Sequence, residues 1–252
     1  MSSFRQKPDH DVLVRFYTLD HPGRTTVVWP VSVWPKLVFA ASGTLAVRAE
    51  DRLSILPPTR ALWVPPGARH EMSCRGAASI RTLYFHPKHA PTVPAGPLQV
   101  RPLLRELIVE ACRVGPLLRG NPHHACLDGL LRSELADAQP SPFQLGLPNS
   151  DAARRAADLV LASPSKYPDA EAVAAAVACS RRTLERRFAL ETGLSLGRWL
   201  QHARLIYSTQ LLDDRRSLLD VALAVGYATA SAYAGAFRRE FGVTPASTGR
   251  PR

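Results

Sequence analysis

The chain has 252 residues, of which 46% are hydrophobic and 21% are charged, a balance typical of a globular protein of one or two domains. No run approaches the ~20 apolar residues of a membrane-spanning helix, and no apolar signal core follows the first basic residues, so we expect a cytoplasmic protein without a membrane partner. The formal net charge of +11 favours an acidic partner such as nucleic acid, but basic residues occur in both halves of the chain and do not locate a binding face.

Residues 1–95 are predicted to form a small β-barrel or sandwich. Short apolar stretches alternate there with Pro and Gly, as in all-β domains. The expected strands are Thr25–Val28, Leu37–Ala40, Leu45–Val47, Arg60–Val64 and Ile80–Phe85.

Residues 96–138 change to a helical pattern. Within 98–118 the apolar residues on one face are Leu103, Leu104, Leu107, Ile108 and Ala111, and a second helix is expected over 122–138. This segment either pairs with its twin in a homodimer or packs on the chain's own domains, because dimer seams and core faces share one pattern. The Pro-, Gly- and Ser-containing segment 139–150 is predicted to be the interdomain linker.

The segment 151–252 is predicted to be all-α, and its first feature is a pair of short helices joined by a tight turn. Asp169 and Ser180 are expected to cap these helices at their N-termini. Leu184 and Phe188 lie four residues apart on the second helix and are expected to face inward.

The opposite side of that second helix carries Arg182 and Arg186, also four residues apart. A single Arg-rich helix is typical of a solvated surface. An arginine on an exposed helix can also donate two hydrogen bonds to guanine, worth roughly 1–3 kcal/mol of base discrimination. Arg181 and Arg187 lie at the sides of the helix, where phosphates would be.

A second unit of the same kind favours DNA reading over a merely solvated face. Ser217 and Asp220 form a capping-box-like start, Gly226 supplies the left-handed turn, and Thr229 caps the last helix. Its expected buried side consists of Tyr233, Phe237 and Phe241. Ser231 and Ala232 lie on its small, weakly polar outer face, so we expect weaker base reading there.

Residues 195–212 are expected to form one helix between the two units. Eighteen residues of α-helix span about 27 Å. One turn of B-DNA spans about 34 Å. A rigid spacer of this length can present two reading helices to successive major grooves on one face of the duplex.

These motifs together resemble the AraC family of bacterial transcription regulators. The resemblance is carried by residues 178–188, 191–200, 221–227 and 232–245. It implies an AraC-type DNA-binding domain over 151–252. One departure is Ala178, where the family has Gly at the first turn, and an Ala held at positive φ costs on the order of 1 kcal/mol.

The resemblance and the helix pattern together assign the expected DNA contacts. The base-reading set is Arg182, Glu185, Arg186, Ser231 and Ala232. The phosphate-contacting or positioning set is Ser180, Arg181, Arg187, Thr229, Arg238 and Arg239.

Residues 1–95 resemble the cupin-like sensor domain of one branch of that family, through residues 36–43, 60–70 and 81–85. Pro30 and Ser32 stand where metal-binding cupins have a pair of His, and only His70 remains of the usual set. One imidazole cannot hold a catalytic metal that needs at least three protein ligands. We therefore expect no metal, no cofactor and no catalytic residues, with Lys36 and His70 lining a ligand pocket instead.

The sequence thus predicts an α+β two-domain chain with an N-terminal cupin-like β-barrel plus helices, then an all-α domain with two helix-turn-helix units joined by a long helix. The predicted function is sequence-specific transcription regulation, with activation favoured. The expected partners are double-stranded promoter DNA, RNA polymerase, a small-molecule effector and a second copy of the chain, and the protein is expected at the nucleoid when bound to DNA. The alternatives are a metal-dependent cupin enzyme and a non-specific architectural DNA-binding protein.

Overall fold

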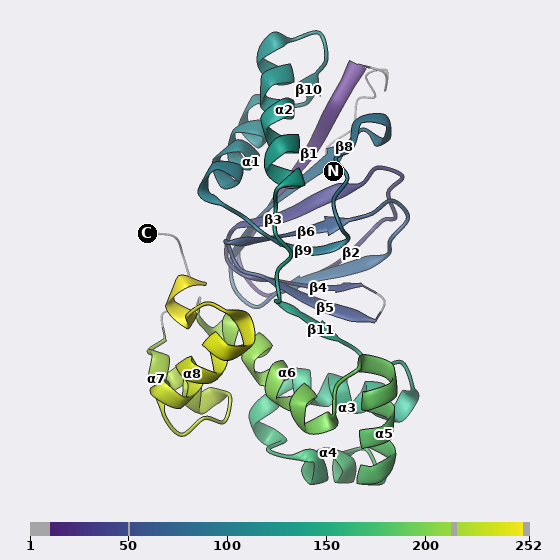
Figure 1. Cartoon of the computed structure of the whole chain (residues 1–252), viewed down its shortest axis with the longest axis vertical. Coiled ribbons are helices and arrows are strands. Elements are labelled where there is room, and N and C mark those ends of the chain that lie inside the picture. The colour runs from purple at the N-terminus through teal and green to yellow at the C-terminus, as the bar shows by residue number, and fades with distance from the viewer. Residues whose placement is uncertain (1–10, 50, 213–215, 249–252) are drawn as a thin grey trace.

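The computed structural model describes residues 11–49, 51–212 and 216–248. Residues 1–10 of the predicted β domain and 249–252 of the predicted DNA-binding domain lie outside the described residues. Two domains are present, a β-rich N-terminal domain and a helical C-terminal domain, which confirms the predicted fold class (Figure 1). In this view the β domain lies between two helices above it and the C-terminal helices below it.

The described part of the β domain contains two antiparallel sheets. The first, sheet A, has the order β10 (Leu117–Leu118), β1 (Val12–His21), β8 (Ala78–Phe85), β3 (Lys36–Ser42), β6 (Arg60–Val64) and β9 (Gly96–Gln99). The second, sheet B, has the order β11 (Gln144–Gly146), β5 (Arg52–Leu56), β4 (Leu45–Ala49), β7 (His70–Cys74) and β2 (Thr25–Trp29). All five expected strands are confirmed, and the other strands are additions to the prediction.

The alternation of side chains along β3 divides the apolar core of the β domain in two. Val38 and Ala40 face sheet B and pack with residues such as Val47 and Met72. The residues between them, such as Phe39, face the other way and pack with the α1–α2 helices. Because both faces of sheet A are covered, the sequence of β3 is a nearly continuous apolar run and does not alternate between apolar and polar residues.

Helices α1 (Pro102–Val114) and α2 (Pro122–Ala136) cover the outer face of sheet A. The expected inner face is buried at Leu104, Leu107, Ile108 and Ala111. The prediction is wrong for Leu103, which is 52% exposed and does not lie on the buried face. The expected helix over 98–118 is also too long, because residues 98–99 belong to β9 and 117–118 belong to β10.

The segment 139–150, which we expect to be the linker, is not a plain loop. Its strand β11 pairs with β5 at the edge of sheet B. Phe143, just before the strand, is fully buried, and its ring stacks on Phe241 of the C-terminal domain at 4.4 Å between centroids. The connection is therefore a strap that is packed against both domains.

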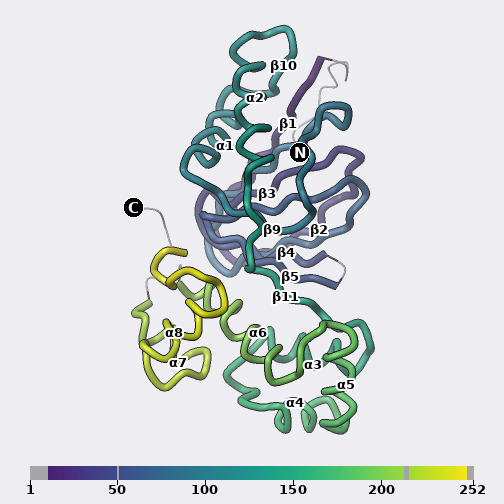
Figure 2. The backbone as a smooth tube through the Cα atoms, viewed as in Figure 1, coloured from purple at the N-terminus to yellow at the C-terminus, as the bar shows by residue number. Residues whose placement is uncertain are grey.

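The C-terminal domain consists of helices from α3 onward (Figure 2). Their bounds are α3 (Asp151–Ala162), α4 (Ala170–Ala176), α5 (Arg181–Thr192), α6 (Leu196–Leu211), α7 (Leu218–Ala224) and α8 (Ala230–Phe241). This domain also contains the short 3-10 helices η3 (Pro164–Lys166) and η5 (Pro245–Ser247), and the β domain contains η2 (Pro87–His89). None of the helices in the described ranges has the length and apolar character needed to cross a membrane.

Candidate nucleic-acid interface

The first helix-turn-helix unit is formed by α4 and α5. The Asp169 side chain accepts a hydrogen bond from the Ala172 N–H at 2.9 Å, and the Ser180 hydroxyl accepts one from the Thr183 N–H at 3.1 Å. Both expected caps are therefore confirmed. Between the helices, Ala178 has a φ of +52°, so the left-handed turn is retained although the residue is not Gly.

The two sides of α5 differ as the helical pattern predicts. Leu184 and Phe188 are fully buried, and the Phe188 ring packs edge-on against Trp199 at 4.9 Å. Arg182 and Arg186 are exposed on the other side. Burial of the apolar pair fixes the helix, and this leaves both guanidinium groups projecting into solvent.

The four arginines of α5 fall into two classes. Arg181 pairs with Glu185 at 2.8 Å, and Arg187 lies 3.8 Å from Glu191. Within the described part of the chain, Arg182 and Arg186 have no carboxylate within 4.0 Å. The central pair is therefore available to a ligand without breaking an ion pair.

Glu185 is half-buried on the reading helix, and its carboxylate is held by Arg181. Reading a cytosine amino group with Glu185 requires it to share or leave that partner. Exposed i,i+4 pairs of this kind are worth only about 0.3–0.5 kcal/mol, so the pair is a weak restraint.

Glu191 is a structural residue that the sequence analysis did not single out. Its Oε2 atom accepts hydrogen bonds from the N–H groups of Asn149 at 2.7 Å and Ser150 at 2.9 Å. Burial acts to raise the pKa of Glu191, but these bonds and Arg187 hold its pKa below the usual value. The carboxylate thus ties the end of α5 to the strap at the start of α3.

The second unit is formed by α7 and α8. Ser217 and Asp220 make a reciprocal capping box, and the Thr229 hydroxyl accepts from the Ala232 N–H at 3.1 Å. Gly226 has a φ of +87° at the turn. The expected buried residues Tyr233, Phe237 and Phe241 are all confirmed.

The outer face of α8 carries short side chains at its start and arginines at its end. Ser231 and Ala232 are exposed, as are Arg238 and Arg239. Gly235 lies beneath Arg239, because a Cβ built there would lie 3.5 Å from the Arg239 Nη1 atom. The start of this face is therefore smooth. Both arginines come from the last turn of the helix, and the Arg239 guanidinium lies back over Gly235.

Helix α6 lies between the two units (Figure 1). Its 16 residues correspond to about 24 Å, slightly less than expected. Leu196, Trp199, Leu200 and Ala203 are buried. Tyr207 is half-buried. It lies against the β domain, where its hydroxyl accepts a hydrogen bond from Arg75 at 2.5 Å.

Lys36 and His70 are brought together by the β domain. Lys36 is 2% exposed, and its Nζ lies over the rings of Trp29 at 5.4 Å and Tyr84 at 5.3 Å. Burial lowers the pKa of Lys36 to about 8. Burial also lowers the pKa of His70, and the charge of Lys36 lowers it further.

Each side chain of this pair has one nitrogen that is not satisfied internally, while the His70 Nδ1 donates to the Ala68 carbonyl at 3.3 Å. The Lys36 Nζ and His70 Nε2 atoms are buried, and neither has a hydrogen-bond partner among the described residues. His70 also lines an open cavity of about 480 Å³, together with Trp29 and Arg154. The described residues contain no group of three or more His, Cys, Asp or Glu side chains placed to hold a metal ion.

Comparison with known proteins gives matches to the helical domain and to the whole chain. A family model described as a helix-turn-helix domain matches residues 173–250. The HTH-type transcriptional regulator NimR of Escherichia coli K12 is 29% identical over 245 residues, which cover 95% of this chain and 89% of that protein. The HTH-type transcriptional activator RhaS of Escherichia fergusonii is 40% identical over 78 residues, which cover 30% of this chain and 27% of that protein.

Among solved structures, the DNA-binding domain of AdpA in complex with a target DNA is 33% identical. The match covers 39% of this chain and 89% of that chain, with a TM-score of 0.36.

Proposed function

The chain belongs to the AraC family of DNA-binding transcription regulators, and from this premise we propose that it reads promoter DNA mainly through Arg182 and Arg186 of α5. The observation that carries the proposal is the division of the α5 arginines: the side pair is bound within the helix, and the central pair is exposed and unpaired in the described residues. Bidentate guanidinium contacts to guanine in the major groove suit this pair.

In this proposal, the second unit binds the neighbouring groove with less base discrimination. Ser231 and Ala232 present a small hydroxyl and a methyl group, which fit close backbone approach and a thymine methyl. Arg238 and Arg239 contact phosphate. Phosphates of the duplex run past the N-termini and the sides of these helices. The N-termini are capped by Ser180 and Thr229, and the sides of α5 carry Arg181 and Arg187.

A direct test of the α5 assignment compares specific with random DNA. Arg186→Ala should weaken binding to the cognate promoter by roughly 1–3 kcal/mol and leave binding to random duplex much less affected. Arg155→Ala, an exposed arginine on α3, is the matched control. Titration of both duplexes with each variant measures the difference, and equal losses on the two duplexes would remove Arg186 from the base-reading set.

We further propose that the protein acts as a homodimer. The packing of α1 and α2 on sheet A leaves large apolar side chains exposed at Leu103 (52%), Val109 (37%) and Leu130 (50%). A second copy can cover this surface, and a twofold pair of chains suits a promoter with two half-sites. The proposed action is activation, which the name of the relative RhaS states for that protein. We propose that it works through contact with RNA polymerase, on the chromosome in the cytoplasm.

The β domain is proposed as a non-enzymatic sensor of a small molecule. Lys36 and His70 each have a buried nitrogen without a hydrogen-bond partner among the described residues, next to the aromatic rings of Trp29 and Tyr84. The Lys36 ammonium is a donor, whereas the Nε2 atom of neutral His70 is an acceptor, because its Nδ1 donates to the Ala68 carbonyl. This chemistry suits a flat effector with both acceptor and donor atoms, because buried polar groups without partners are costly unless a ligand supplies them.

The burial of Lys36 has a consequence for stability that can be measured. The pKa of Lys36 is lowered from 10.5 to about 8 by burial, so between these pH values the unfolded chain binds more protons than the folded chain. The free energy of unfolding should therefore rise with pH in that window, and the rise should be absent in Lys36→Met. Urea unfolding of both proteins across the window tests this, and parallel curves would contradict it.

A further inference from the structure

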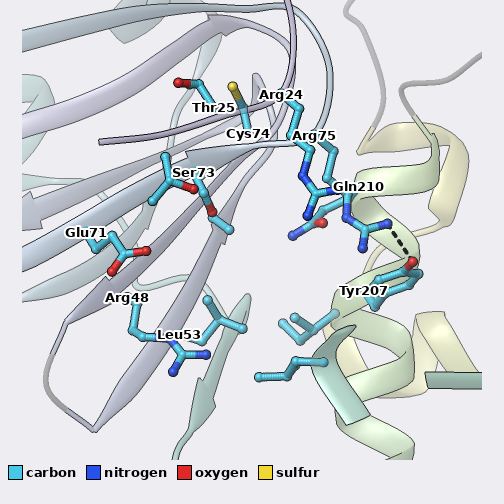
Figure 3. A pocket seen from close by; sticks show the side chains of 14 residues that line it. Arg24, Thr25, Arg48, Leu53, Glu71, Ser73, Cys74, Arg75, Tyr207 and Gln210 are labelled. Atoms are coloured by element: carbon cyan, nitrogen blue, oxygen red, sulfur yellow. Dashed lines mark hydrogen bonds between the residues drawn. The ribbon is translucent and has the colours of Figure 1, made fainter. Parts of the chain in front are cut away.

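A cleft between sheet B and α6 lies away from the exposed arginines of α5. It adjoins the cavity lined by His70, with which it shares Arg48 and Glu71, but Lys36 and His70 do not line it. Its volume is about 310 Å³, within the range of small-molecule sites. One wall consists of β-domain residues that include Arg24, Arg48 and Arg75, and the other includes Tyr207 and Gln210 of α6 (Figure 3). Any ligand that fills it touches both domains.

The charge of the cleft is unbalanced. Three guanidinium groups line it against one carboxylate, that of Glu71. Arg48 is held by Asp158 of α3 at 2.9 Å, so its charge is already neutralised. Arg24 and Arg75 have no carboxylate partner among the described residues, and Figure 3 shows both side chains reaching from the β domain toward α6.

Arg75 is restrained by the helical domain, but only through neutral groups. Its Nη1 donates to the Tyr207 hydroxyl at 2.5 Å, and its guanidinium carbon lies 4.3 Å from the centre of the Tyr207 ring. These contacts fix the position of the guanidinium without cancelling its charge. A positioned and uncompensated Arg beside a second one is the arrangement that binds carboxylate or phosphate oxygens.

The remaining polar lining selects against a simple inorganic ion. Thr25, Thr26 and Ser73 offer hydroxyl groups, Gln210 offers an amide, and Glu71 offers an acceptor. Such groups match the hydroxyls of a polar organic molecule, which both donate and accept hydrogen bonds.

We propose that this cleft binds a small hydroxylated organic anion, whose carboxylate or phosphate lies between Arg24 and Arg75 and whose hydroxyls contact Glu71, Ser73 and Gln210. Because the walls belong to two domains, the bound anion stabilises their docked arrangement. Helix α6 joins the two helix-turn-helix units, so occupancy of the cleft also fixes the element that sets their spacing. Anion binding and DNA binding are then coupled, and each changes the affinity of the other by the same factor.

The test uses the full-length chain with three probes: glucose 6-phosphate, gluconate and glucose. Thermal unfolding and titration calorimetry should detect binding of at least one of the two anions and none of neutral glucose. A response to glucose 6-phosphate alone identifies a phosphate ligand, and a response to gluconate alone identifies a sugar acid. Failure of both anions to bind, or equal binding of glucose, overturns the proposal.

Two variants locate the binding. Arg24→Gln should weaken the anion by about tenfold or more, because a charge-assisted contact is lost. Arg24 is exposed, so the fold should tolerate the change. Arg52→Gln, on β5 and outside the cleft lining, should leave anion affinity unchanged. An unaltered affinity in Arg24→Gln, or an equal loss in Arg52→Gln, places the anion elsewhere and overturns the assignment.

DNA binding provides an independent readout. Without any anion, Arg24→Gln should bind promoter DNA as the wild type does, and only the wild type should change its DNA affinity when the binding anion is added. If the chain fails to prefer promoter DNA but still binds the anion through Arg24, the DNA-reading proposal fails and the cleft assignment survives. If the wild type binds the anion with no change in DNA affinity, the coupling is wrong.

Discussion

The two helix-turn-helix units share a backbone plan and differ in what they present to DNA. Both have a capped entry helix, a left-handed turn and a second helix with two or more buried apolar residues. The first places the unpaired Arg182 and Arg186 in the first half of α5, whereas the second has Ser231 and Ala232 at the start of α8 and its arginines near the end. Similar folding requirements thus leave the exposed face free to vary, because buried positions are fixed by packing and exposed ones are not.

The units also differ in how they are held to the rest of the chain. Trp199, at the start of α6, donates its indole N–H to the Gly146 carbonyl at 2.7 Å, and Glu191 binds the strap through two backbone N–H groups. The second unit instead packs its Phe237 and Phe241 rings on Phe143. Polar contacts therefore anchor the first unit, and aromatic packing anchors the second.

The largest expected effect on stability comes from removing the Phe143 ring, which packs on Phe237 and Phe241. Phe143→Ala should destabilise the protein by about 3–5 kcal/mol, because it removes a fully buried ring between the β domain and α8. Hydrogen exchange should rise more in α8 than in α5. Phe143→Leu, which retains most of the apolar volume, is the matched control and should lose less. A uniform rise in both helices would contradict the distinction between the anchors.

A smaller effect comes from exchanging the turn residues. Ala178 and Gly226 both have positive φ, which only Gly adopts without a steric penalty. Ala178→Gly should stabilise the chain and Gly226→Ala should destabilise it, each by about 1 kcal/mol. Denaturant unfolding measures both, and Ala176→Gly, at the last residue of α4, controls for the added flexibility of Gly. Changes of the same sign in the two turn variants would show that the turns are not equivalent.

The smallest expected effect concerns the phosphate contact of the second unit. Arg238→Ala should weaken cognate and random DNA alike and reduce the slope of log K against log salt by about one unit. Filter binding or anisotropy over a salt series gives the slope. An unchanged slope removes Arg238 from the phosphate set, and a loss confined to cognate DNA would instead assign base reading to α8.

Local signals explain why so much of the helical domain could be predicted. Caps such as Ser180 and Thr229, the turn at Gly226 and the buried pair Leu184 and Phe188 depend on residues within a few positions of one another. In the β domain, five apolar stretches were sufficient to identify strands. The strands outside the prediction include β1, in which Arg15, Thr18 and Asp20 interrupt the apolar run, and β11, whose Pro- and Gly-containing surroundings resemble a linker.

Capping and helical periodicity act over a few residues, so they are enough to predict both helix-turn-helix units and the helix between them. Which charges outside these helices stay unpaired depends instead on how the chain packs in three dimensions. That packing buries Lys36 against Trp29 and Tyr84, and it sets Arg24 and Arg75 opposite Tyr207 across a domain boundary. Such pairings join residues far apart in the chain, and their energies depend on distance and burial, which sequence spacing does not encode.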